Sequence, residues 1–245
     1  MSEEALGAEA AEEKSRERAT ASHAARRDPH RAPPVVLAAT SGTGKTTIAR
    51  NLVSGSDRYV FSTSATTRPP RPGERDGVDY HFLSEERFEE LAAAGAFVEW
   101  ARVHDRLYGT PLEEIEEAAR RGRHVVLDID VQGARQIRRM IPDAVLIFVL
   151  PPSVDIMMVR LKRRGTEPPE KIARRLVSAL EELQAASEFD HVVVNDDLDE
   201  CLEEIRAIVE EGTAPEAPEI DAHRLREEIA GILEREYGPY VQDNG

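Results

Sequence analysis

The chain has 245 residues, and its 47 acidic and 32 basic side chains give a formal net charge of −15 at pH 7. General binding to nucleic acid requires a broad basic surface, which this balance excludes. The one cysteine excludes a disulfide framework and a zinc site made of cysteines. No apolar run reaches the roughly 18–20 residues that span a bilayer. We therefore expect a cytoplasmic protein that binds neither nucleic acid nor membranes.

The first 31 residues differ in composition from the rest of the chain. Met1 and Leu6 are their only large apolar side chains, and Ala, Glu and Arg dominate them. Such a segment buries too little surface to offset the entropy that is lost on ordering. The composition predicts a disordered tail over 1–31, followed by one domain over 32–212.

Within this domain, apolar runs of strand length alternate with helical patterns. Strands are expected at 35–39, 125–129, 144–150 and 192–194. Helices are expected at 46–53, 85–93, 112–121, 154–164, 169–186 and 198–211. The alternation predicts the α/β class, with a parallel sheet that helices cover on both faces. In such a sheet, ligands bind at the carboxyl ends of the strands.

The strongest local motif lies between the first expected strand and the first expected helix. It consists of Ala39, Thr40, Ser41, Gly42, Thr43, Gly44, Lys45 and Thr46. Except at its first position it matches the Walker A pattern, in which backbone N–H groups bind nucleotide phosphates. The pattern predicts an ATP site where Lys45 reaches the β- and γ-phosphates and Thr46 ligates Mg²⁺. Ala39 replaces the usual glycine, and its methyl group could crowd the loop. A glycine-rich turn with an incidental lysine is the alternative.

A second motif joins two arginines to a proline-rich stretch over 62–74. Prolines favour an extended helix with three residues per turn, which would place Arg68 and Arg71 on the same side. Two guanidinium groups that face one way suit a phosphate, and Tyr80 could bring a phenol to the same anion. Taken alone, the stretch could equally be a proline-rich loop that binds a partner.

Together with six further segments, these motifs resemble the guanylate kinase family in order and spacing over about 33–212. The matching segments are 66–74, 77–82, 99–100, 107–110, 127–133, 163–166 and 194–199. The resemblance implies a three-layer P-loop NTPase fold with a parallel central sheet. It also implies a GMP-binding subdomain over 67–115 and a small helical lid over 160–190.

The activity that the resemblance implies is reversible, Mg²⁺-dependent transfer of the ATP γ-phosphoryl group to GMP or dGMP, in purine nucleotide metabolism. Arg68, Arg71, Tyr80 and Tyr108 would hold the GMP phosphate. Glu99 would accept the two N–H donors of guanine, with Ser64, Thr110 and Asp130 completing base recognition. Asp128 would lie near the phosphates and contact Mg²⁺ indirectly. Outside this family, Glu99 would be interpreted as a solvated carboxylate and Asp130 as a helix cap.

The expected lid contains a third basic cluster. Arg160 and Arg164 share one face of the expected helix at i,i+4 spacing. The resemblance implies that Arg164 and Arg175 close on the transferring phosphoryl group, and that Arg160 and Asn195 lie near ATP. Lys45, Arg68, Arg164 and Arg175 are thus the expected catalytic residues.

The ends of the domain and one of its turns depart from the family pattern. Two prolines in 213–219 predict a linker, and the rest of 213–245 contains an expected helix at 221–236. Its apolar face is formed by Leu225, Ile229, Ile232 and Leu233. That face either packs on its own domain or joins a homo-oligomer. Asp105 stands where the family often has glycine, and Arg106 could pair with it.

Two other functions remain open from the sequence. A catalytically silent interaction module of the same family would bind GMP without turnover. A P-loop kinase for another phosphorylated acceptor would differ in its acceptor profile.

Overall fold

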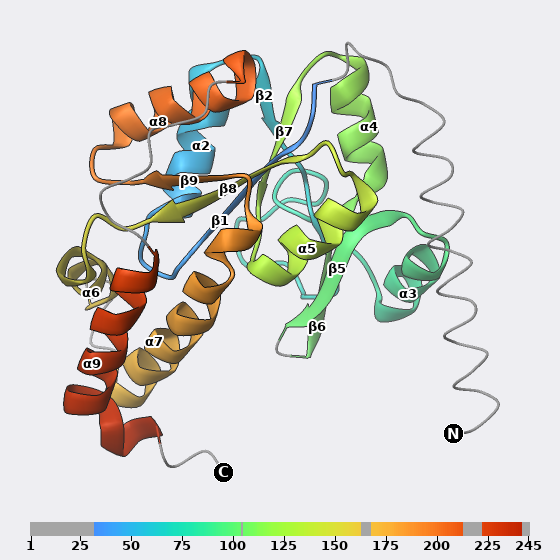
Figure 1. The fold of residues 1–245 in the computed structure, drawn as a ribbon. Helices are drawn as coiled ribbons and strands as arrows, with labels where there is room; N and C mark the ends of the chain where they lie inside the picture. Colours follow the sequence, from blue (N-terminus) through green and yellow to red (C-terminus); the bar gives the residue numbers. More distant parts are fainter. Residues whose placement is uncertain (1–31, 104, 163–167, 213–221, 242–245) are drawn as a thin grey trace. The chain divides into compact units, whose positions relative to one another are not determined.

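The computed structural model describes residues 32–103, 105–162, 168–212 and 222–241 (Figure 1). The tail predicted over 1–31, the lid residue Arg164 and the linker predicted over 213–219 lie outside these residues. The chain divides into two compact units. The first unit contains the described chain up to Pro34, together with Ser56–Leu127 and Gln132–Ala144. The second contains Val35–Gly55, Asp128–Val131 and Val145–Gly245.

Parallel strands form the centre of the second unit. Strand β1 (Val35–Ala39) pairs with β8 (Val145–Leu150), which pairs with β9 (His191–Val194), all in parallel. All three strands were expected from their apolar runs, and β1 is wholly buried. The helices are α2 (Lys45–Gly55), α6 (Val154–Lys162), α7 (Pro169–Gln184), α8 (Leu198–Arg206) and α9 (Ala222–Val241). A short 3₁₀ turn, Ala186–Glu188, precedes β9.

The predicted boundaries hold closely in this unit, with two corrections. The helix expected over 221–236 continues to Val241. The helix expected over 198–211 is α-helical only to Arg206 and continues as a π-helical turn over Ala207–Glu211. Gly212 ends it with φ 66°, the left-handed conformation that suits glycine after a helix. At its start, the Asp197 carboxylate accepts the backbone N–H groups of Asp199 and Glu200.

The C-terminal helix α9 packs on α7 of its own chain (Figure 1). Leu225 and Ile229 are buried in one hydrophobic cluster with Leu176 of α7. Ile232 and Leu233 pack against the same cluster and are partly buried. The interpretation that the apolar face covers its own domain is therefore confirmed.

The first unit contains a parallel pair and a separate four-stranded sheet. Strand β2 (Tyr59–Phe61) pairs in parallel with β7 (His124–Asp128). The four-stranded sheet has the order β4-β3-β6-β5. Its strands are β3 (Ala65–Thr66), β4 (His81–Phe82), β5 (Phe97–Val103) and β6 (Arg106–Pro111). The helices are α3 (Glu85–Ala93), α4 (Leu112–Arg120) and α5 (Val131–Met140).

The four-stranded sheet has a small core of its own, in which Phe88 of α3 stacks on Phe97 of β5 with ring centroids 4.4 Å apart. Helix α3 begins after Ser84, whose hydroxyl accepts the Arg87 N–H. The β5–β6 turn contains Asp105 with φ 62°, the only positive φ of a non-glycine residue in the described chain. This left-handed conformation suits glycine, the residue that the resemblance led us to expect at this position. Arg106 donates to the carbonyl of Thr67, instead of the ion pair with Asp105 that the sequence suggested.

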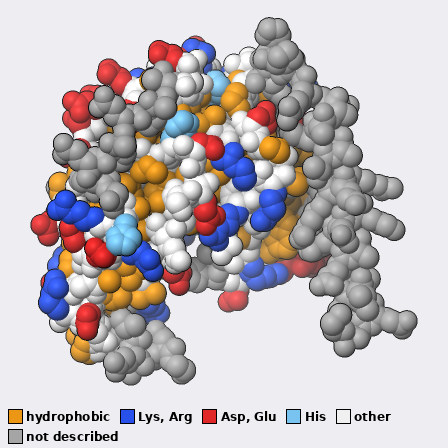
Figure 2. Space-filling view, in the orientation of Figure 1, with side chains coloured by type: hydrophobic (Ala, Val, Ile, Leu, Met, Phe, Trp, Pro, Cys, Tyr) orange, Lys and Arg blue, Asp and Glu red, His pale blue; other side chains and the backbone are white. Residues whose placement is uncertain are grey.

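Acidic and basic side chains are interspersed over the face of the molecule that Figure 2 shows. In the described residues, no helix is both long and apolar enough to cross a membrane.

Candidate active site

The loop over 39–46 follows β1 and leads into α2. Ala39 is the last residue of β1 and keeps ordinary strand geometry, whereas Gly42 and Gly44 have φ values of 90° and 97°. A Cβ atom on Gly44 would lie 2.8 Å from the Asn195 side-chain nitrogen. Glycine is thus required at 42 and 44 but not at 39. The backbone at Ala39 therefore needs no glycine conformation.

Lys45 is held at the first turn of α2. Its ammonium group donates to the Ile129 carbonyl at 2.5 Å and lies 3.0 Å from a carboxylate oxygen of Asp128. Asp128 is the last residue of β7 and Ile129 follows it. Asp128 was expected to lie near the phosphates. The ammonium group and the N-terminus of α2 together form an anion-binding position.

Arg160 and Asn195 meet at the carbonyl of Thr43. Arg160 donates to it at 3.0 Å, and the Asn195 amide nitrogen donates to it at 2.6 Å. The structure therefore brings together three residues that were predicted to bind ATP. Arg160 and Asn195 also border a cavity of about 330 Å³, whose full lining is Gly42, Gly44, Thr47, Arg160, Asn195, Asp196 and Leu198.

Glu182 of α7 is a charged neighbour of this loop that the sequence did not reveal. Its carboxylate accepts the backbone N–H of Ser41 and lies near Lys45. Its Oε2 atom is buried and makes no hydrogen bond. Burial raises the pKa of Glu182 to about 7, with Asp130 and Glu181 adding to the rise, while Lys45 and the Ser41 N–H oppose it. Nothing in the sequence links residues 41 and 182, which come together only through the fold.

The hydroxyl of Thr46 and the carboxylate of Asp128 are the groups available for Mg²⁺. Thr46 is exposed in the first turn of α2, and Asp128 is half-buried beside Lys45. The described residues contain no cluster of three or more His, Cys, Asp or Glu side chains that could hold a metal alone. Mg²⁺ bound to nucleotides takes one or two protein ligands, with phosphate and water completing its shell. The residues present fit that mode of binding.

In the first unit, Glu99 and Thr110 form a buried pair. They lie opposite each other on β5 and β6, and the Thr110 hydroxyl donates to the Glu99 carboxylate at 2.5 Å. Glu99 is 9% exposed and Thr110 is 1% exposed. A carboxylate oriented by an internal donor can accept two adjacent N–H groups from a ligand.

Arg68 lies among two aromatic rings and an acidic partner. Its guanidinium group forms two hydrogen bonds to Glu74, at 2.9 and 3.1 Å, and lies 5.3 Å from the Tyr80 ring centroid. The Tyr80 and Tyr108 rings meet edge to face at 6.2 Å. Arg68 lowers the pKa of Glu74, helped by the backbone N–H of Arg71, and Glu74 in turn raises the pKa of Arg68. Three of the four predicted phosphate-binding residues thus lie together, and Glu74 is the orienting partner that sequence reasoning missed.

Arg71 has an exposed side chain in the same loop. Its backbone carbonyl accepts the backbone N–H of Glu74 in a turn. Ser64 precedes β3, and its carbonyl accepts the backbone N–H of His81. The His81 ring contacts Glu114 at 3.1 Å, and Glu114 also accepts the Thr63 N–H at 3.5 Å. Glu114 thus supports the chain next to Ser64 and next to Tyr80.

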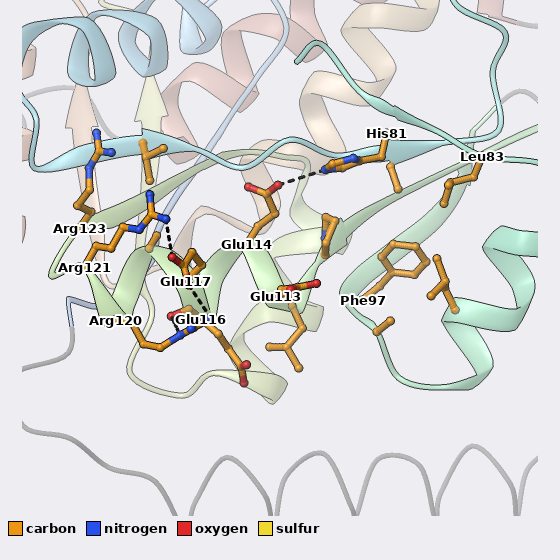
Figure 3. A pocket seen from close by; sticks show the side chains of 17 residues that line it. His81, Leu83, Phe97, Glu113, Glu114, Glu116, Glu117, Arg120, Arg121 and Arg123 are labelled. Carbon is orange, nitrogen blue, oxygen red and sulfur yellow. Dashed lines mark hydrogen bonds and ion pairs between the residues drawn. The ribbon is translucent and has the colours of Figure 1, made fainter. Parts of the chain in front are cut away.

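A cavity of about 870 Å³ lies beside these supports (Figure 3). Its lining includes the His81–Glu114 pair, Phe97 and Leu83. At its other end, Glu117 pairs with both Arg120 and Arg121 (Figure 3). None of the predicted site residues lines this cavity.

Comparison with known proteins assigns the family. The family model described as guanylate kinase matches residues 31–212. The chain belongs to the guanylate kinase family. It is 50% identical over 183 residues to "Guanylate kinase" of Nitratidesulfovibrio vulgaris, which covers 74% of this chain and 88% of that protein. It is 49% identical over 175 residues to "Guanylate kinase" of Symbiobacterium thermophilum, covering 71% of this chain and 83% of that protein.

A solved structure also resembles the chain. The crystal structure of guanylate kinase from Anaplasma phagocytophilum aligns with a TM-score of 0.58 and 30% sequence identity. The alignment covers 84% of this chain and 95% of that one. The predicted α/β fold of the P-loop NTPase type, with its parallel strands, is therefore confirmed.

Proposed function

We propose that the protein transfers the γ-phosphoryl group of ATP to GMP, giving ADP and GDP, as its family implies. The buried Glu99–Thr110 pair is the observation that supports GMP as the acceptor. Guanine presents two adjacent N–H donors on its pairing edge, which one carboxylate can accept together. Adenine presents an acceptor at N1 and cannot donate there, so the buried carboxylate would lose one of the two hydrogen bonds that guanine offers, at a cost of about 1–3 kcal/mol. dGMP carries the same base and is expected to be a second acceptor.

Several side chains would position the phosphates. Lys45 would reach the ATP phosphates from the N-terminus of α2, and Arg160 and Asn195 would border the nucleotide. Arg68, Arg71, Tyr80 and Tyr108 would hold the GMP phosphate. Glu74 supports this role because it holds the Arg68 guanidinium in one orientation. Phosphoryl transfer between two nucleotides needs no covalent intermediate, so positioning and charge neutralisation supply the catalysis.

Mg²⁺ is part of the proposal as the companion of ATP. Thr46 would hold it and Asp128 would contact it indirectly. When bound, Mg²⁺ supplies charge neutralisation at the phosphate oxygens. The Lys45 ammonium group lies 3.0 Å from an Asp128 carboxylate oxygen, and this contact supports a position of Asp128 beside the loop.

We also propose that 67–115 acts as the acceptor-binding subdomain and that 160–190 acts as a lid. In the lid, Arg164 and Arg175 would neutralise charge on the transferring group, and Ser64 and Asp130 would complete base recognition. A role in purine nucleotide metabolism in the cytoplasm is the setting we expect. A homo-oligomer has no specific support from the described contacts of α9, whose apolar face its own chain covers.

The test is product analysis with Mg²⁺, ATP and GMP. We expect ADP and GDP in equal amounts, and at least a hundredfold lower rate in Lys45→Ala, since one phosphate-stabilising cation contributes several kcal/mol. Circular dichroism of the variant controls for folding. Hydrolysis of ATP without GDP, or full activity of Lys45→Ala, would contradict the proposal.

A further inference from the structure

Strand β5 is an outer strand of the four-stranded sheet, and one side chain substitutes for its missing neighbour. On its inner side β5 pairs with β6. On its other side, Gln136 of α5 forms two hydrogen bonds to the backbone of Trp100. The Gln136 Oε1 accepts the Trp100 N–H at 3.2 Å, and its Nε2 donates to the Trp100 carbonyl at 3.1 Å. A side-chain amide with both bonds satisfied reproduces the pairing of a further strand.

Trp100 directly follows Glu99, the carboxylate expected to bind guanine. Neighbouring residues of a strand direct their backbone groups to opposite edges. Glu99 lies opposite Thr110 of β6, whereas the backbone of Trp100 is bound by Gln136. The strand is therefore held from both edges at the position of this carboxylate.

Other contacts hold this part of β5 less firmly. The Trp100 side chain is 42% exposed, and its ring meets Phe88 edge to face at 6.3 Å. The register of β5 on β6 shifts between Phe97 and Glu99, just before the carboxylate. Such a bulge interrupts regular pairing, so the outer hydrogen bonds carry more of the positioning here.

We propose that Gln136 is a positioning residue that sets the acceptor specificity of the enzyme, by fixing the β5 backbone so that the Glu99 carboxylate meets the two N–H donors of guanine. The inference rests on the proposed function and adds a residue to it. Small displacements of a positioned group weaken binding and catalysis strongly. Gln136 need not touch the nucleotide to have this effect.

Three variants test the proposal. Gln136→Met keeps the length of the side chain and removes both hydrogen bonds. Gln136→Glu keeps an acceptor for the Trp100 N–H and removes the donor. Arg139→Ala changes an exposed residue of the same helix and serves as the control. The readouts are the GMP dissociation constant from calorimetry and the KM values for GMP and ATP.

We expect Gln136→Met to raise the dissociation constant and KM of GMP about tenfold, as the loss of two hydrogen bonds allows. The KM of ATP should stay within twofold, Gln136→Glu should be intermediate, and Arg139→Ala should match the wild type. In a Glu99→Gln background, Gln136→Met should have little further effect on GMP, because both changes act through the same contact.

Other outcomes distinguish a failure of the positioning role of Gln136 from a failure of the proposed function. Equal weakening of GMP and ATP binding, or an undiminished effect in the Glu99→Gln background, would assign Gln136 a purely structural role and overturn the inference. Unchanged GMP binding by Gln136→Met, with an active wild type, would also overturn it and leave the proposed function intact. A wild-type protein that does not bind GMP would overturn both.

Discussion

The hydroxyl of Thr110 donates a 2.5 Å hydrogen bond to the carboxylate of Glu99 across two antiparallel strands. Both side chains are buried, so the hydrogen bond offsets part of the cost of placing a carboxylate there. It also limits the orientations that the carboxylate can take. An oriented carboxylate distinguishes a base with two donors from one that presents an acceptor.

Replacement of Thr110 by valine removes this hydrogen bond and keeps the shape of the side chain. We expect the KM for GMP to rise about tenfold to a hundredfold, since hydrogen bonds to charged groups contribute about 1.5–3 kcal/mol. The KM for ATP should not change, and Thr110→Ser should recover most of the loss. Steady-state kinetics with each substrate varied in turn gives both values. An unchanged GMP KM in Thr110→Val would show that this contact does not orient the carboxylate.

Replacement of Glu182 by glutamine should stabilise the protein increasingly as the pH rises. Because burial raises the pKa of Glu182 to about 7, the folded protein keeps a proton that the unfolded chain loses above its ordinary value. Wild-type stability therefore falls between about pH 4.5 and 7 relative to Glu182→Gln, which does not titrate. Thermal unfolding should give matching Tm values at about pH 4, below the ordinary pKa, and a Tm higher by about 2–4 °C for the variant at pH 8. A Tm difference between Glu182→Gln and the wild type that shrinks as the pH rises would contradict the burial of this carboxyl group.

The turn at Asp105 allows a test of backbone strain. Its φ of 62° suits glycine best, aspartate less well and alanine least. We expect the Tm to follow the order Asp105→Gly, wild type, Asp105→Ala, with the alanine variant destabilised by about 1 kcal/mol. Glycine also adds conformational freedom to the unfolded chain. The stability gained by Asp105→Gly should therefore be smaller than the stability lost by Asp105→Ala. Denaturation by urea gives the free energies, and an alanine variant as stable as the glycine variant would contradict this geometry.

The attachment of α9 to α7 is tested at Ile229. This side chain is fully buried in the cluster that includes Leu176. Ile229→Ala should lower the free energy of unfolding by about 2–5 kcal/mol, the usual range for a buried aliphatic truncation. Glu228→Ala changes an exposed neighbour that pairs with Arg224 and should cost less than about 0.5 kcal/mol. Equal effects of the two substitutions would mean that α9 is not packed as described.

Continuous apolar runs predicted four of the parallel strands in the described residues, but not the three-residue β2. Strands buried on both faces leave little ambiguity in a sequence. The run 35–39 became β1 with the same ends. No strand of the four-stranded sheet was predicted. β3 and β4 have two residues each and show no periodicity, and the longer β5 and β6 mix apolar with charged residues instead of forming a continuous apolar run. Their pairing depends on the core around Phe88 and Phe97.

The candidate site was likewise only partly predictable from the sequence. The glycine-rich loop and the arginines belong to motifs of contiguous residues, so the sequence could suggest them. Glu182 and Gln136 contact Ser41 and Trp100 only after the chain has folded, and no short motif connects them. A sequence pattern gives no backbone angles, so it could not show that Ala39 has ordinary strand geometry, which does not require glycine.

The most direct test of the proposed function is the acceptor profile of the protein. Initial rates with Mg²⁺ and ATP are measured for GMP, dGMP, AMP, UMP and CMP, with the wild type beside Glu99→Ala. We expect turnover with GMP and dGMP alone, and a loss of most of that turnover in the variant. Comparable rates with AMP or a pyrimidine nucleotide would show a kinase of another specificity, and GMP binding without any turnover would show a silent binding module.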